Sequence, residues 1–448
     1  MELFYEKNYI VFKKEKMKKV LIITYYWVPS GGSGVQRWVK FTKYLRDFGW
    51  EPIIYTPQNP EYPAIDNSFE KDIPQDISVM KTPIWEPYNV YRKLTGKKGE
   101  SINAGFISEG KAKNWKDKLS IWIRGNFLIP DPRCFWIKPS VRFLSKYLKE
   151  NPVDAIISTG PPHSMHMIAL GVKKKIPNLP WIADFRDPWT GIYFYKDLQL
   201  TKFADYIHRQ QEKKIITSAD SVIVVSKKME DDFNALSPKN ICIIRNGFDE
   251  DDFQTSKPSL DSKFSISYIG LLTTKQNPVV LWKVLRELCD EKEYFRADLA
   301  IHLTGKIDFS ALDSIEENDL EQYLTVGGYV PHVEAIKRQQ SSQLLLLLLT
   351  KDDYGILTGK FFEYLAAQRP ILGVGSTICE VANILRETNA GKMVDFDDET
   401  AIRETILTFY EQYKNGTLHV NSNSVTQYSR RNLTKQLAEL LDEMIFTS

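Results

Sequence analysis

The sequence predicts an α/β protein of two doubly wound domains, each built on a parallel sheet with helices on both faces. Short, almost wholly apolar segments alternate with helical patterns in two series, one over 19–226 and one over 264–375. Uniformly apolar strands separated by helices are typical of parallel sheets buried on both faces. A chain of 448 residues with 43% hydrophobic content can form two such cores.

The strand segments follow one another in the order that this architecture requires. The first is predicted over 19–26, and a glycine-rich turn and a helix over 35–49 follow it. The remaining strands of the first series are expected at 51–56, 153–160, 180–186 and 221–226. The strands of the second series are expected at 264–270, 298–305, 324–330, 344–350 and 371–375.

The two series are expected to join near residues 245–253, and a helix closes the chain. Apolar residues recur at i, i+4, i+7 and i+8 within 429–445, which predicts a helix that packs back across the first domain. The predicted organisation is an N-terminal domain, a C-terminal domain and a returning helix, over 17–250, 251–425 and 426–448.

Composition narrows the class of protein. The net charge of +2 gives no global field for nucleic acid. The four cysteines are scattered singly, so neither a zinc site nor a disulfide framework is expected, and a cytoplasmic location fits. The first sixteen residues lack the apolar core of a signal peptide, and Met17 reads as a natural start. The longest apolar run, residues 344–349, is too short to span a bilayer.

Residues 88–138 form a distinct insertion that is both basic and aromatic. Eleven Lys and Arg stand against four Asp and Glu, with eight Trp, Tyr and Phe between them. This mixture is typical of proteins that lie on an anionic membrane surface. We therefore expect peripheral membrane contact, with a solvated insertion packed on its own domain as the alternative. Nucleic-acid binding through this stretch is a weaker option.

The glycine-rich turn of the first domain, PSGGSGVQR, is a candidate phosphate or sugar loop. Glycines allow the backbone to approach a ligand, and the N-terminus of the following helix favours an anion. The candidate contacts are Gly31, Gly32, Ser33, Gly34 and Arg37; the alternative is a structural tight turn. A dinucleotide site is not indicated, because Arg37 stands where the third glycine belongs and no acidic residue ends the second strand.

Two further strand ends of the first domain carry polar candidates, at the edge where ligands bind in open α/β sheets. The segment STGPPHSMH places His163 and His166 after one strand, and ADFRDPW places Asp184, Arg186 and Asp187 after the next. His163 is the first candidate for contact with a substrate and Asp184 the second. Charges at a strand terminus need partners or a ligand, so an internal Asp–Arg salt bridge is the alternative.

The second domain offers a candidate diphosphate and ribose site. One strand ends at Gly270 and brings Lys275 into the next loop, while LTGKFFEYLAA places Lys360 at the start of a helix. Two lysines and a helix N-terminus suit a diphosphate. Glu363 lies one turn further on in an apolar helix, where it could accept two ribose hydroxyls; a neighbouring Lys or Arg holding it is the alternative.

Taken in order, the segments SGGSGVQR, ADFRDPW, SADSVIVVS, RNGFD and GKFFEYLAAQRPIL resemble GT-B glycosyltransferases of the GT4-like group of bacterial polysaccharide assembly. The resemblance runs from Lys18 to the C-terminal helix. It implies a cleft between two Rossmann-like domains, with the acceptor mainly on the first and the sugar nucleotide mainly on the second. Its donor contacts would be Glu363 for the ribose, Thr358, Gly359, Lys360 and Lys275 for the diphosphate, and the backbone at Tyr329 and Val330 for the base.

This chain departs from the family pattern at two positions. The family's first acid, eight residues before Glu363, is Gly355 here, and a frequent arginine is Leu271. The donor sugar and the stereochemical outcome are therefore left open. Asp352 and Asp353 are interpreted as a solvated loop rather than a metal-binding motif.

The expected function is transfer of a hexosyl group from a nucleoside diphosphate sugar to a glycan or lipid-linked acceptor in cell-surface polysaccharide synthesis. The resemblance implies a retaining enzyme without metal or cofactor, located in the cytoplasm or on the inner face of the cytoplasmic membrane. Two alternatives stay open: a sugar-nucleotide epimerase of the same fold, and a two-lobed sugar-binding protein without catalysis.

Overall fold

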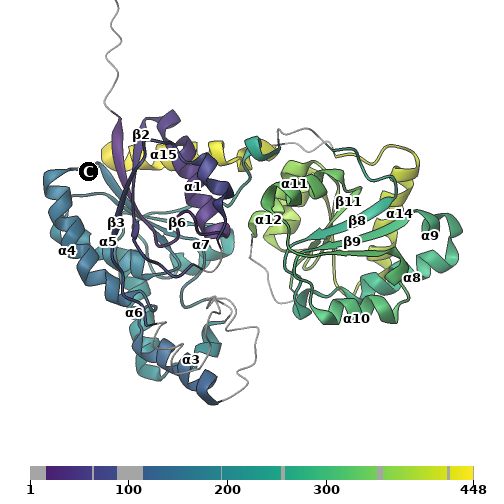
Figure 1. Cartoon of the computed structure of the whole chain (residues 1–448), viewed down its shortest axis with the longest axis horizontal. Helices are drawn as coiled ribbons and strands as arrows, with labels where there is room; N and C mark the ends of the chain where they lie inside the picture. Colours follow the sequence, from purple (N-terminus) through teal and green to yellow (C-terminus); the bar gives the residue numbers. More distant parts are fainter. Residues whose placement is uncertain are drawn as a thin grey trace, which may run out of the picture.

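The chain forms two α/β domains that are joined by two chain crossings, with the C-terminal helix α15 lying on the first domain beside α1 (Figure 1). This is a computed structural model, and it describes residues 17–62, 65–87, 115–192, 194–253, 258–350, 357–420 and 424–446. Each domain has one sheet in which every strand pairing is parallel. The predicted fold class is confirmed.

The first domain is built on a seven-stranded sheet in the order β3-β2-β1-β4-β5-β6-β7. Its strands are β1 (Lys18–Ile23), β2 (Trp50–Pro57), β3 (Ser78–Thr82), β4 (Ala155–Gly160), β5 (Trp181–Phe185), β6 (Ser221–Val224) and β7 (Ile241–Ile243). Its helices are α1 (Ser33–Leu45), α3 (Trp115–Phe127), α4 (Cys134–Glu150), α5 (Ser164–Lys175), α6 (Lys202–Ser218) and α7 (Lys227–Asn234). Short 3-10 turns are η1 (Arg46–Phe48), η2 (Asn67–Asp72) and η3 (Tyr195–Leu198).

The second domain is built on a six-stranded sheet in the order β10-β9-β8-β11-β12-β13. Its strands are β8 (Phe264–Ile269), β9 (Leu299–Thr304), β10 (Leu324–Gly327), β11 (Leu344–Leu348), β12 (Ile371–Val374) and β13 (Gly391–Val394). Its helices are α8 (Val279–Glu291), α9 (Glu293–Asp298), α10 (Phe309–Glu317), α11 (His332–Ser341), α12 (Gly359–Ala367), α13 (Glu380–Thr388) and α14 (Glu399–Lys414). The turns η4 (Glu250–Phe253), η5 (Thr274–Gln276), η6 (Glu321–Tyr323) and η7 (Val425–Tyr428) precede or connect these elements, and α15 spans Arg430–Phe446.

The leucine run of β11 shows why the strands are apolar throughout. Leu344, Leu346 and Leu348 belong to one core cluster, packed with α8, α10 and α14. Leu345 and Leu347 belong to the opposite cluster, packed with α12 and α13. Because successive side chains of a strand point to opposite faces, a strand covered on both sides buries every residue.

Three strands were not anticipated, and all three lie at the edges of their sheets. They are β3, β7 and β13. Edge strands are covered less completely, and no residue of β3 or β7 is fully buried. Their sequences therefore lack the continuous apolar run that marked the central strands.

The two crossings between the domains are tied to each other. Phe248 and Ser429 form a parallel bridge, and the Arg430 amide donates to the Phe248 carbonyl at 2.7 Å. Helix α15 then packs on α1, with Leu433, Leu437 and Leu441 in the core shared with that helix. This pairing fixes the segment that connects β7 to the second domain.

No helix in the described parts of the chain is long and apolar enough to cross a membrane. Of the basic and aromatic insertion, residues 88–114 lie outside the described residues, and the rest forms α3 and the start of α4.

Candidate functional site

Helix α12 begins without a side-chain cap. Thr358 occupies its N-cap position with extended backbone, and the Thr358 side chain makes no capping hydrogen bond. The first amide groups of a helix have no acceptor within the helix and form the positive end of its dipole. Among the described residues none accepts from the amides of Gly359 or Lys360, so both can donate to an anion.

The Lys360 ammonium lies beside this helix start. Its Nζ is 3.9 Å from the centre of the Tyr268 ring, and a Cβ added at Gly270 would lie 3.1 Å from it. Within the described segments no carboxylate comes within 4.0 Å of Nζ. Burial lowers the pKa of Lys360 to about 7, although the charge of Glu363 opposes this shift. A desolvated ammonium without a carboxylate partner gains strongly from binding a phosphate oxygen.

Glu363 lies one turn further along α12, and its carboxylate is held by three donors. His332 Nε2 lies 2.9 Å from Oε1, Gln339 Nε2 donates to Oε2 at 3.3 Å, and Gln36 Nε2 donates to Oε1 at 3.4 Å. Burial alone would raise the pKa of Glu363, but the hydrogen bond and charge of His332 outweigh it and the pKa is lowered. The pKa of His332 is correspondingly raised. The interaction therefore favours the charged form of both the carboxylate and the imidazole.

The three partners of Glu363 were missed in the sequence. The alternative considered there was a neighbouring Lys or Arg, whereas one histidine and two glutamines hold it. Gln36 comes from α1 of the first domain, so its hydrogen bond joins the two domains at this point. His332 closes the segment GGYVPH, two residues after Val330. One signal in the sequence could have identified it: His332 follows the strand predicted over 324–330, at the start of the next helix.

The other predicted donor contacts are exposed or half-buried. Lys275 lies exposed in the turn η5, and no ion pair to it occurs in the described segments. Tyr329 is 84% exposed, and Val330 is half-buried. These residues are open to a ligand, but no contact brings Lys275 or Tyr329 to Lys360 or Glu363. Gly355, Asp352 and Asp353 lie outside the described residues.

Arg37 and Asp184 form an internal ion pair, so the structure argues against the ligand roles expected for them. Both side chains are 0% exposed, with 2.9 Å between Nη2 and Oδ1. The Arg37 guanidinium also donates to the carbonyls of Ile244 and Arg245 at 2.9 and 2.8 Å. Because these carbonyls belong to the segment leaving β7, Arg37 fixes α1 to the first crossing between the domains.

The Asp184 carboxylate has no free face for chemistry. Besides Arg37, it accepts from Trp38 Nε1 at 2.9 Å and from Thr159 Oγ1 at 2.8 Å. Burial would raise its pKa, but Arg37, the Thr159 hydroxyl and the charge of Arg186 hold the pKa below its usual range. We therefore assign Asp184 to the framework of the first domain. The salt-bridge alternative was right in kind, but the arginine is Arg37 rather than Arg186.

The glycine-rich loop lies against Arg186 rather than being open along its whole length. A Cβ at Gly34 would lie 1.8 Å from Arg186 Nη1, so a larger residue there would require the Arg186 side chain to move. Arg186 Nε donates to the Gly160 carbonyl at 3.3 Å, and Nη2 donates to that of Pro161. Asp187 is exposed.

The start of the loop is only partly accessible. Gly31 is buried, whereas Gly32 is exposed at the N-cap of α1, where a glycine cannot cap the helix with a side chain. The Ser33 side chain lies outside the described residues. Gly32 is thus the loop residue best placed to meet a ligand.

The two histidines predicted for the site in the first domain, His163 and His166, are buried and uncharged. His163 is 8% exposed, and its ring stacks on Trp189 with centroids 4.5 Å apart. Burial lowers the pKa of His163 well below its ordinary value and that of His166 to about 3. His166 Nδ1 is 2.8 Å from Ser158 Oγ inside the core, which indicates a structural role. His163, at the strand edge and with no partner for Nδ1 among the described residues, keeps its candidacy.

One group of carboxylates is close enough to share a cation, and lysine already occupies that place. Asp72, Asp249 and Asp252 form it, within the described parts of the chain. Lys40 Nζ lies 2.8, 2.6 and 3.0 Å from their oxygens. The group is therefore a buried ion cluster that fixes α1 to the crossing segment.

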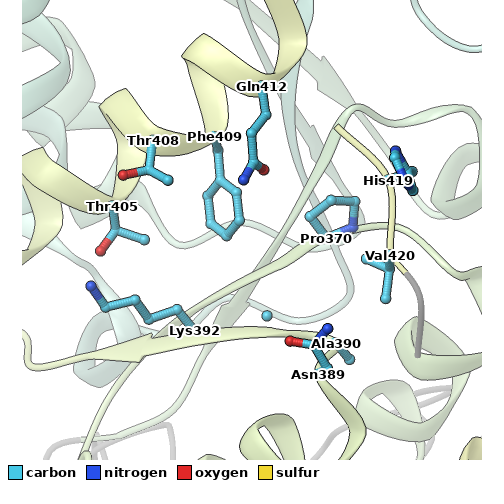
Figure 2. Close-up of a pocket in the computed structure, with 11 residues that line it drawn as sticks. Pro370, Asn389, Ala390, Lys392, Thr405, Thr408, Phe409, Gln412, His419 and Val420 are labelled. Carbon is cyan, nitrogen blue, oxygen red and sulfur yellow. The ribbon is translucent and has the colours of Figure 1, made fainter. Parts of the chain in front are cut away.

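A pocket of about 250 Å³ lies elsewhere on the second domain, between α14, the start of β13 and residues 419–420 (Figure 2). None of the predicted site residues lines it. Thr405 and Thr408 on its wall donate to carbonyls of their own helix at 2.6 and 2.8 Å. Because none of the residues at the start of α12 lines it, the pocket is separate from that candidate site.

Comparison with known proteins bears on the family and the fold of the chain. Residues 107–252 match the family model described as Glycosyltransferase Family 4. No curated protein sequence matches the chain. Among solved structures, sucrose-phosphate synthase from Thermosynechococcus elongatus is 13% identical, with a TM-score of 0.59 over 96% of this chain and 100% of its own. Anabaena HepE, solved with UDP-glucose, is 13% identical, with a TM-score of 0.58 over 95% and 100%.

A putative UDP-N-acetylglucosamine 2-epimerase from Listeria monocytogenes is also similar, at 9% identity and a TM-score of 0.55 over 96% of this chain and 98% of its own. At such identities the likeness establishes the fold alone, and the family model points to the glycosyltransferases within it. The resemblance to GT4-like glycosyltransferases is therefore confirmed: the chain has the GT-B fold, and its residues 107–252 match Glycosyltransferase Family 4.

Proposed function

We propose that this protein transfers a hexosyl group from a nucleoside diphosphate sugar to a glycan or lipid-linked acceptor in cell-surface polysaccharide synthesis. The family match and the GT-B neighbours support glycosyltransferase activity. One observation carries the donor assignment. Lys360 lacks a counter-ion among the described residues at the uncapped start of α12, and Glu363 lies one turn behind it.

The leaving diphosphate would bind at this helix start. Departure of the nucleoside diphosphate places negative charge on its terminal phosphate, which the Lys360 ammonium and the amides of Gly359 and Lys360 can stabilise. Donors fixed in a partly buried site need little reorganisation as that charge develops. This arrangement supports a mechanism without a metal ion or cofactor, in which protein cations and dipoles stabilise the leaving group.

Ribose hydroxyls would donate to the Glu363 carboxylate. His332 keeps the carboxylate ionised, and the Gln36 hydrogen bond, at 3.4 Å, is the longest of its three contacts. A ribose hydroxyl can replace that long bond without leaving the carboxylate unpaired. The proposed contact would thus exchange a hydrogen bond between the domains for one to the donor.

The sugar would face the first domain, where His163 is the candidate contact. Its ring is neutral, so it would act as a hydrogen-bonding group rather than a cation. We propose retention of anomeric configuration, as the GT4 resemblance implies. Location in the cytoplasm, at the inner face of the membrane, and membrane contact through residues 88–138 belong to the same proposal.

The test compares Glu363→Ala with wild type by calorimetry with UDP and with GDP. Loss of a charge-assisted contact pair should weaken binding of the cognate nucleotide by roughly 10- to 100-fold. Glu316→Ala, an exposed acid on α10, is the matched control and should bind as wild type. Unchanged affinity of Glu363→Ala for both nucleotides would refute the site. A thermal-shift screen of UDP-, GDP-, CMP- and dTDP-sugars identifies the donor.

The similarity to a putative epimerase calls for a second measurement. Incubation of the identified nucleotide sugar without acceptor, followed by NMR, should return it unchanged apart from slow hydrolysis. Accumulation of an epimer would favour the epimerase alternative. Tight binding with no turnover, across a panel of lipid-linked and glycan acceptors, would favour a sugar-binding protein.

A further inference from the structure

Three large aromatic side chains stand exposed on two helices of the first domain, away from its cores and from the candidate site. Phe127 on α3 is 68% exposed, and Phe203 and Tyr206 on α6 are 73% and 60% exposed. A hydrogen-bonded contact brings the helices together here. Asn126 Oδ1 accepts from the Thr201 amide at 2.7 Å, so Phe127 and Phe203 each lie within two residues of that contact.

Helix α3 is held firmly at this end. His208 Nδ1 accepts from Trp189 Nε1 at 3.1 Å, so the neutral ring carries its proton on Nε2 and donates it to the Gly125 carbonyl at 3.2 Å. Burial lowers the pKa of His208, which keeps the ring neutral. A Cβ at Gly125 would lie 2.8 Å from the Leu198 carbonyl oxygen, so the two backbones pack closely. The outward face of α3 is therefore displayed by a fixed helix.

That outward face is an apolar stripe. Leu119 and Ile123 are 45% and 40% exposed, and with Phe127 they stand at i, i+4 and i+8. Trp122 packs against Phe127, with ring centroids 5.5 Å apart. Residues at this spacing share one face of a helix. Exposed apolar side chains gathered in this way mark an interaction surface.

The outward face of α6 continues from aromatic to basic. Five exposed residues follow one another along it at helical spacing: Phe203, Tyr206, Gln210, Lys213 and Lys214. At the far end of the helix, the Lys214 ammonium lowers the pKa of the exposed Lys174 on α5 by direct repulsion. Positive charge at that end of α6 is thus crowded enough for two ammonium groups to repel each other.

Few carboxylates offset this charge. Asp205 accepts from the Tyr195 hydroxyl at 2.9 Å and pairs with Arg209 at 3.0 Å. Glu212 is buried and accepts from the Thr190 amide at 3.0 Å. Of the three acidic residues on η3 and α6, only Asp197 has no side-chain hydrogen bond or ion pair within the described segments.

We propose that α3 and α6 together form a docking surface for an anionic lipid bilayer. Aromatic rings at one end would enter the headgroup region, and the lysines along α6 would bind anionic headgroups, as in helices that lie in the membrane interface. A second copy that docked through the same surface would cover the apolar stripe equally well, but it would place lysines against lysines. The bilayer accounts for both halves of the surface.

This surface differs from the one that the sequence indicated. The basic and aromatic insertion contributes α3, but the other half comes from α6, which begins more than sixty residues after the insertion ends. The inference extends the proposed function, because a lipid-linked acceptor would be met at such a surface. It can be tested without donor, acceptor or activity.

The experiment is flotation of the full chain with phosphatidylcholine vesicles, with and without phosphatidylglycerol. Wild type should bind the anionic vesicles about tenfold more strongly. The double variants Phe127→Ser with Phe203→Ser, and Lys213→Glu with Lys214→Glu, should each lower that binding about tenfold or more. Phe309→Ser, on the 80% exposed ring of α10, and Lys337→Glu with Lys392→Glu are the matched controls and should bind as wild type.

Binding of both double variants at the wild-type level would overturn the proposal. Failure of the wild-type chain to bind the vesicles would also overturn it. In that case, a dimer seen by light scattering in wild type and lost in the Phe127→Ser, Phe203→Ser variant would assign the surface to a second copy. UDP and GDP binding, measured on every variant, should stay unchanged. Failure of nucleotide binding in wild type refutes the proposed transfer from a nucleotide sugar, whereas failure of flotation refutes the docking surface and the membrane contact proposed for residues 88–138.

Discussion

Replacing Lys360 with methionine should make the protein more stable at neutral pH while removing its affinity for a nucleoside diphosphate. The pKa of Lys360 falls from 10.5 to about 7 because the ammonium is buried. At about 1.4 kcal/mol per pKa unit, this corresponds to about 5 kcal/mol for a fully desolvated group. The side chain is partly exposed, which reduces the figure to about 3 kcal/mol.

The sign of the pH dependence follows from the lowered pKa. Between about pH 7 and pH 10.5 the unfolded chain keeps the Lys360 proton and the folded protein has lost it. Stability of the wild type should therefore rise with pH across this window. Lys360→Met has no such proton, and its side chain can keep the contact with the Tyr268 ring. The variant should be more stable near pH 6.5, and its advantage should vanish near pH 10.

The measurement is the thermal midpoint of both proteins from pH 6 to pH 10. About 3 kcal/mol corresponds to roughly 6–12 °C for a domain of this size. Lys275→Met, at an exposed position, is the control and should show no pH-dependent difference from wild type. A Lys360→Met advantage that does not change with pH, or a variant less stable at pH 6.5, would refute the reasoning.

Three further outcomes follow from the same contacts. Because phosphate binding favours the charged form of Lys360, affinity for UDP or GDP should fall as the pH rises from 7 to 9, and calorimetry in two buffers should detect proton uptake. Asp184→Asn breaks a buried ion pair and should cost about 3–5 kcal/mol of unfolding free energy in urea, while refolded protein keeps its nucleotide affinity; weaker binding at full stability would contradict the framework assignment. His332→Leu should weaken nucleotide binding by roughly tenfold, with His332→Gln closer to wild type; equal loss in both would show that donation to Glu363 is not what matters.

The sequence by itself determined the sheets and the start of the donor site, because these depend on local pattern. A short, continuous run of leucines such as Leu344–Leu349 is typical of a strand covered on both faces. Lys360 and Glu363 share one turn of one helix, so their relation needs no knowledge of the rest of the fold. The confirmed fold class rests on such signals.

Tertiary structure decided which side chains the polar and charged residues of the site contact. Gln36 and Glu363 are 327 residues apart, and Arg37 and Asp184 are 147 apart, yet each pair is joined by a hydrogen bond. The edge strands and the exposed faces of α3 and α6 likewise depend on which elements pack beside them. A charged residue in an apolar segment of the sequence indicates that its side chain needs a partner or a ligand. Which of the two it has depends on the loops that the sheets bring to one edge. For Asp184 the fold supplied an arginine; for Lys360, among the described residues, it supplied none.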